Sequence, residues 1–122
     1  MTNSIERGLK TEGLLPGPIR LQRKAGDFFR QAEKTVESLD RYLLQINAFA
    51  FAASEENGAG HIVVTAPTSG ASGVLPSIIY FLLKREIADM KAIREGLMLA
   101  ALIAFVSKHN ASISGAEVGC QG

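Results

Sequence analysis

The chain has 122 residues, and its 47% hydrophobic and 20% charged content suits one domain with a core and excludes a disordered protein. Thirteen basic and twelve acidic residues give a net charge of +1, so no basic surface for nucleic acid or for an anionic membrane is indicated. The longest uncharged apolar run, residues 96–106, is shorter than the ~20 residues that cross a bilayer, and the polar N-terminus does not resemble a secretory signal.

Residues 1–19 are predicted to be irregular. Three glycines and two prolines interrupt this stretch too densely for a long helix. In the chain taken alone, the segment is expected to be a surface arm.

Two helices are predicted next from apolar residues that recur at helical spacing. The first begins near Arg20. The second begins at Thr35 or Ser38, either of which can cap its N-terminus, and stops at Asn57-Gly58 in a left-handed conformation. Its continuous apolar stripe predicts a core face, and the phenylalanines of both helices are assigned to the core. The stripe consists of Leu39, Tyr42, Leu43, Ile46, Phe49, Ala50 and Ala53.

A β-type run, His-Ile-Val-Val-Thr-Ala at residues 61–66, follows. Because no second strand is available to pair with it, we expect an extended segment that is buried among helices. A loop of small residues, 68–73, then opens a helix over 74–85. In this helix Ser72 is the expected N-cap and Pro76 falls in the first turn.

A last helix is predicted at about 89–109. Between residues 96 and 106 it is apolar on all sides, which indicates a fully buried core helix. The predicted fold class is therefore mainly α, a helical bundle-like arrangement with one short extended segment and glycine-rich loops.

Two loops carry the candidate chemistry. The backbone N–H groups and helix dipole at 68–73 favour an anion, although an ordinary capped turn explains the same residues. The segment 111–122 holds the only cysteine, Cys120, between Gly119 and Gly122. Glycine neighbours make a thiol accessible, whereas the alternative is a small buried hydrophobe. One cysteine excludes an internal disulfide and fits a reducing cytoplasm.

Three stretches of the sequence are distinctive: Ile-Glu-Arg-Gly-Leu-Lys-Thr-Glu-Gly-Leu-Leu-Pro-Gly-Pro at 5–18, the glycine-rich stretch from Glu55 to Pro76, and Ser-Ile-Ser-Gly-Ala-Glu-Val-Gly-Cys-Gln-Gly at 112–122. Together these three stretches resemble one family, the bacterial iron–sulfur L-serine dehydratases (L-serine ammonia-lyases). Their order and spacing match the family over nearly all 122 residues. The resemblance implies that residues 1–122 are the N-terminal part of the catalytic (alpha) domain, whose remainder lies outside this sequence.

The resemblance also implies a cofactor and its ligand. Cys120 would be one of three thiolate ligands to a [4Fe–4S] cluster, with the other two cysteines in the absent part. Three thiolates leave one iron open as a Lewis acid, which assists departure of the L-serine hydroxyl and leads to pyruvate and ammonia. The N-terminal stretch would be an ordered loop against the core, with Arg7 and Glu12 as polar anchors.

Substrate contacts are expected from both loops: Thr68, Ser69, Gly70, Ser72, Gly73, Ser112 and Ser114. Many members of the family carry Cys where this chain has Ser72. Because this chain has no thiol at that position, the cluster ligands are expected at other positions. The catalytic base stays unassigned, because His61 and His109 fit structural roles better.

Two alternatives remain. The chain is a non-catalytic helical domain that associates with another copy or with the rest of an enzyme, or the same fold acts on a related β-substituted amino acid such as cysteine or threonine. The expected partners are L-serine and a second copy or the rest of the enzyme, without nucleic acid or membrane.

Overall fold

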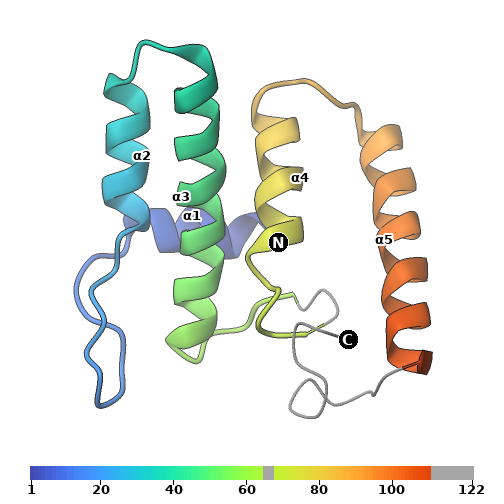
Figure 1. Cartoon of the computed structure of the whole chain (residues 1–122), viewed down its shortest axis with the longest axis horizontal. Helices are drawn as coiled ribbons and strands as arrows, with labels where there is room; N and C mark the ends of the chain where they lie inside the picture. Colours follow the sequence, from blue (N-terminus) through green and yellow to red (C-terminus); the bar gives the residue numbers. More distant parts are fainter. Residues whose placement is uncertain (65–67, 111–122) are drawn as a thin grey trace.

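The computed structural model describes residues 1–64 and 68–110, which form five helices (Figure 1). The described part of the chain contains no sheet, and its one β-bridge joins Leu14 to Gln22. The predicted mainly helical class is therefore confirmed. In chain order the helices are α1 (Thr2–Lys10), α2 (Ala25–Lys34), α3 (Ser38–Gly58), α4 (Val74–Lys84) and α5 (Met90–Asn110).

The core lies where α1 to α4 meet. Helix α3 stands between α2 and α4, and α1 runs across all three (Figure 1). Phe49 of α3 is 1% exposed and occupies the centre. Its ring centroid lies 6.0 Å from that of Phe29 and 4.7 Å from that of Tyr80, which meets it edge-on. The assignment of the phenylalanines to the core is thus confirmed for Phe49, and the half-buried Phe29 and Phe51 pack against the core. Phe28 is half-buried and stacks on Phe51.

Helix α1 corrects the prediction that residues 1–19 are irregular. Ile5 is fully buried in the core, and Gly8 faces α3 so closely that a Cβ at this position would overlap the carbonyl of Ala52. A glycine that indicates a break in the sequence therefore serves here as a contact between two helices. Packing outweighs the low helix propensity of glycine, which is about 1 kcal/mol below that of alanine. Only the part after Lys10 is irregular.

Helix α2 begins later than the apolar spacing predicts, at Ala25. Residues 21–23 instead pair with residues 13–15, where Leu15 N–H donates to the carbonyl of Leu21 at 2.7 Å. The start of α2 is capped from another helix, because Glu55 accepts hydrogen bonds from Lys24 N–H (2.7 Å) and Ala25 N–H (3.3 Å). A carboxylate at this position satisfies free N–H groups and complements the helix dipole.

The predicted ends of α3 differ from the structure. Glu37 is the N-cap residue and makes no side-chain cap bond, so neither Thr35 nor Ser38 caps the helix. Helix α3 ends at Gly58 as predicted, but the left-handed residue is Gly60, with φ 79°.

Residues 61–64 belong to no helix or strand, and they are not buried, although burial was expected. Ile62 is 93% exposed. Helices α3 and α4 pack directly against one another, and residues 61–64 leave the end of α3 towards the start of α4 (Figure 1). The expectation of an extended segment buried among helices is therefore wrong for these residues.

Helix α5 is the second large correction. Its bounds agree with the prediction to within one residue, yet Ile93 is its only buried residue. Figure 1 shows α5 beyond α4 and away from the core. A helix that is apolar on all sides needs protein on all sides, and the described part of the chain supplies cover near Ile93 alone. Six large apolar residues of α5 are more than half exposed: Met98, Leu99, Leu102, Ile103, Phe105 and Val106.

None of the helices in the described ranges has both the length and the apolar composition of a membrane span.

Candidate functional site

The loop 68–73 is a series of tight turns that leads into α4. Ala71 N–H donates to the Thr68 carbonyl at 3.2 Å, Ser72 N–H to the Ser69 carbonyl at 3.1 Å, and Val74 N–H to the Ala71 carbonyl at 3.1 Å. The N–H groups of Ala71 and Ser72 in the predicted anion site, and the first N–H group of α4, therefore already have partners within the loop.

The six residues of this loop divide into an outer and an inner part. Thr68 is half-buried and Ser69 and Gly70 are exposed, whereas Ser72 and Gly73 are buried. Gly73 lies so close to α3 that a Cβ would overlap Ser54 Oγ and the carbonyl oxygen of Ala50. The inner part thus packs on α3, and the outer part is open to a ligand.

Ser72 does not cap α4, which corrects the expectation from the sequence. Gly73 is the N-cap residue and no side-chain cap bond is present. The Ser72 hydroxyl is buried and has no hydrogen-bond partner among the described residues. Pro76 lies in the first turn of α4, as predicted.

The last turn of α3 holds the connection that ends in this loop. His61 N–H donates to the Glu56 carbonyl at 3.0 Å, and Asn57 Nδ2 donates to the Ser69 carbonyl at 3.1 Å. The two ends of the connection are therefore fixed to neighbouring residues of one helix.

Glu56 is the most heavily paired side chain near the loop. Its carboxylate is fully buried and accepts hydrogen bonds from Arg7 Nε and from Arg23 Nη1, the latter at 2.9 Å, and its Oε2 lies 2.9 Å from His61 Nδ1. Burial raises the pKa of Glu56, but the hydrogen bonds from Arg7, Arg23 and His61 outweigh burial, so the pKa lies below its usual 4.5. Glu56 is therefore an ionised acid inside the fold.

Sequence reasoning did not single out Glu56. The available signal was a pair of acids, Glu55 and Glu56, at the end of a helix whose preceding residues are apolar. Arg7 and Glu12, the expected polar anchors, both have ion-pair partners, although Arg7 lies on α1 and not in a loop. Arg7 binds Glu56, and Glu12 accepts a hydrogen bond from Arg30 at 3.0 Å.

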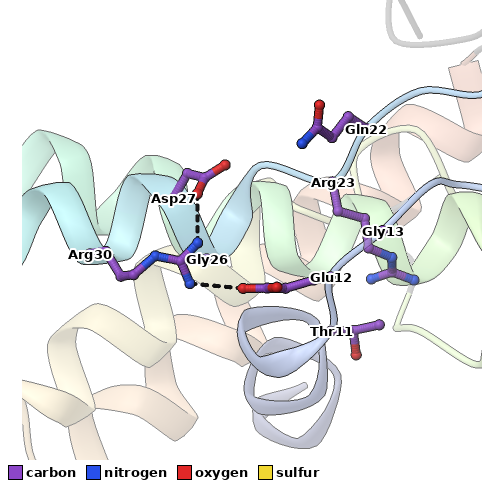
Figure 2. A pocket seen from close by; sticks show the side chains of 8 residues that line it. All are labelled: Thr11, Glu12, Gly13, Gln22, Arg23, Gly26, Asp27 and Arg30. Carbon is purple, nitrogen blue, oxygen red and sulfur yellow. Dashed lines mark hydrogen bonds and ion pairs between the residues drawn. The ribbon is translucent and has the colours of Figure 1, made fainter.

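Two clefts lie on other parts of the surface. Figure 2 shows the smaller one, of about 130 Å³, where Arg30 pairs with both Glu12 and Asp27. The larger cleft, of about 340 Å³, has an aromatic floor that includes Tyr80 and a charged rim that includes Glu6. Burial and the negative charge of Glu6 raise the pKa of Tyr80, so its hydroxyl stays protonated. Neither cleft is lined by the loop 68–73.

The predicted cluster ligand Cys120 lies outside the described residues, as do Ser112 and Ser114. Within residues 1–64 and 68–110, no group of three His, Cys, Asp or Glu side chains is placed to hold a metal ion. The described geometry therefore concerns the loop 68–73 and the residues that support it.

The sequence matches known proteins along its full length. The family profile described as serine dehydratase alpha chain matches residues 1–122. The chain is 44% identical to an L-serine dehydratase of Haemophilus influenzae over 127 residues, which cover 100% of this chain and 28% of that protein. It is 45% identical to L-serine dehydratase 2 of Escherichia coli, again over 100% of this chain and 28% of the relative.

A more distant relative, an L-serine dehydratase of Streptomyces coelicolor, is 39% identical over 100% of this chain and 27% of its own length. The chain thus spans between a quarter and a third of the length of these relatives. With the match to the family profile over every residue, the chain belongs to the serine dehydratase alpha chain family.

Proposed function

We propose that this chain is part of an L-serine dehydratase, which converts L-serine to pyruvate and ammonia. The observation that carries the proposal is the identity of 44–45% to proteins named L-serine dehydratase, over the whole of this chain. In the proposed reaction the α-proton and the β-hydroxyl of L-serine leave as water. The resulting enamine becomes an imine, and hydrolysis of the imine gives the two products.

The loop 68–73 is the proposed site for the substrate carboxylate. Its outer residues, Thr68, Ser69 and Gly70, are accessible, and the loop opens α4, whose N-terminus favours negative charge. Ser72 and Gly73 are proposed to support the site indirectly, because the buried end of the loop packs against α3 at Gly73. Ser112 and Ser114 are proposed as further substrate contacts.

The proposed cofactor is a [4Fe–4S] cluster, with Cys120 as one thiolate ligand. The chain's single cysteine does not fit a complete cluster site, because the cube requires several thiolates. The remaining ligands must come from the part of the enzyme outside this chain. When bound, such a cluster supplies a Lewis-acidic iron. This proposal assigns no catalytic base to the chain, and places the enzyme in the cytoplasm, where thiols stay reduced.

The exposure of α5 favours a second role, association with other protein. Apolar side chains on several sides of this helix are open to solvent, and apolar surface of this kind is typical of a protein–protein contact. The proposed partner is the rest of the enzyme, and a second copy of the chain is the alternative. Nothing in the loop 68–73 distinguishes L-serine from L-threonine or L-cysteine, so the experiment below compares all three as substrates.

The test compares two cysteine–serine exchanges in the intact enzyme that contains this chain. Cys120→Ser is expected to lose most of the iron and the turnover, because a serine oxygen is a harder donor that holds this centre poorly. Ser72→Cys should keep both, since the proposed role of the loop depends on its backbone. Iron content and pyruvate formation from L-serine, L-threonine and L-cysteine are measured under anaerobic conditions. Full iron and activity in Cys120→Ser would refute the proposed ligand.

A further inference from the structure

Glu56 joins three parts of the chain that are distant in sequence. Arg7 comes from α1, Arg23 from the extended residues before α2, and His61 from the start of the connection to the loop 68–73. The Arg23 side chain is 5% exposed and that of Glu56 is fully buried, so this ion pair is shielded from solvent.

The neighbouring residue fixes the far end of the same connection. Asn57 donates to the Ser69 carbonyl at 3.1 Å, and the Glu56 carbonyl accepts from His61 N–H at 3.0 Å. The Glu56 carboxylate also contacts the His61 ring. One turn of α3 therefore makes three hydrogen bonds, two that fix residue 61 at the start of the connection and one that fixes the loop 68–73.

A buried ion cluster is a costly way to obtain stability alone. Removing a carboxylate from water carries a large desolvation penalty, and apolar residues of similar size often stabilise a fold at least as well. An ion pair does, however, impose direction, because each donor must meet the carboxylate at one distance and angle. Such a cluster is therefore suited to hold a segment in one position.

We propose that Glu56 is a positioning residue for the substrate-carboxylate loop. Its carboxylate fixes the His61 ring, and together with Asn57 it holds the loop 68–73 in one position relative to α3. Through Arg7 it also makes that position depend on the docking of α1. This inference rests on the proposed function of the loop, although the positioning itself has a readout that does not require catalysis.

The first measurement uses the intact enzyme that contains this chain. Glu56→Gln keeps the shape of the side chain and removes its charge, so the loop should lose its fixed position. The KM for L-serine should rise about tenfold while kcat changes little, as expected when substrate binding alone is weakened. Iron content should stay that of the wild type. The matched control is Glu12→Gln, which breaks an exposed ion pair to Arg30 and should leave KM unchanged.

Coupling between residues separates positioning from a general loss of stability. Once Glu56→Gln has released the ring, His61→Asn should raise KM no further, so the two changes should be non-additive. Glu56→Asp, which keeps the charge, should recover part of the wild-type KM. A purely structural role would instead lower Tm and leave KM unchanged in every folded variant, and this result would overturn the proposal.

Hydrogen exchange tests the loop directly, with or without turnover. In Glu56→Gln the Ala71 and Ser72 amides should exchange at least about tenfold faster than in the wild type, because their bonds within the loop open more often. Unchanged protection would overturn the positioning role. If the wild type forms no pyruvate, the proposed function fails while this measurement still decides the role of Glu56. If Glu56→Gln does not fold, His61→Asn, which removes the ring that the Glu56 carboxylate holds and leaves both arginine pairs in place, decides by the same two readouts.

Discussion

Two helical glycines have opposite surroundings, and this difference predicts opposite effects of the same substitution. A Cβ at Gly8 would overlap the Ala52 backbone, whereas a Cβ at Gly96 in α5 would meet nothing within 4 Å. Gly8→Ala should therefore lower the free energy of unfolding by about 1–3 kcal/mol through overpacking. Gly96→Ala should raise it by about 0.5–1 kcal/mol, because alanine loses less backbone entropy in a helix. Urea denaturation of both variants measures the difference, and equal effects would contradict the close packing of α1 on α3.

Glu56 predicts how stability depends on pH. Its pKa is lowered in the folded chain, so the folded state favours the ionised form. The stabilisation that results is fully present above the usual pKa of 4.5 and is lost as the pH falls through the lower folded value. The free energy of unfolding should therefore decrease on acidification below about 4.5. Denaturation curves at several pH values should show the gap between wild type and Glu56→Gln narrowing as the pH falls. A constant gap would contradict the predicted shift.

Sequence reasoning reached some residues of the site and missed others for a physical reason. Arg7 and Glu12 were expected as anchors because the resemblance to a known family implied that role, and both have ion-pair partners in the structure. Glu56 was missed because its partners come from positions 7, 23 and 61, which only the folded chain brings together. The Ser72 cap failed for a similar reason, since α3 and not the start of α4 determines how the loop packs.

At the scale of elements, apolar spacing predicted α3, α4 and α5 well, because each carries its own helical pattern. It did not predict α1, whose burial rests on Ile5 and on a glycine contact with α3. It also predicted burial for residues 61–64 and for α5. Hydrophobicity indicates that a residue favours burial, but it does not say whether the cover comes from the same chain.

Helix α5 leads to a prediction about association. Its exposed apolar side chains should drive the isolated chain to form dimers or larger species, since contact between copies removes them from water. Replacing Leu102 and Phe105 together by Lys should shift the chain towards the monomer without loss of helix. Sedimentation velocity and circular dichroism measure the two effects. The control is Glu95→Gln, on a polar position of the same helix. A compact wild-type monomer at high concentration would contradict the prediction.

At the scale of the whole molecule, the proposed chemistry needs more protein than this chain contributes. The chain has one cysteine, and the described residues hold no group of three metal-binding side chains. One thiolate supplies a minority of the ligands of a [4Fe–4S] cube. The isolated chain is therefore expected to bind no stable cluster and to form no pyruvate from L-serine.

Anaerobic reconstitution with iron and sulfide, followed by visible absorbance and a pyruvate assay, tests this last prediction. Cys120→Ser in the isolated chain is the control, and it should behave like the wild type because neither completes a ligand set. In the intact enzyme the same substitution should remove most of the iron, so the two contexts should give opposite results. A brown, catalytically active monomer of the isolated chain would show that the ligands have been assigned to the wrong residues.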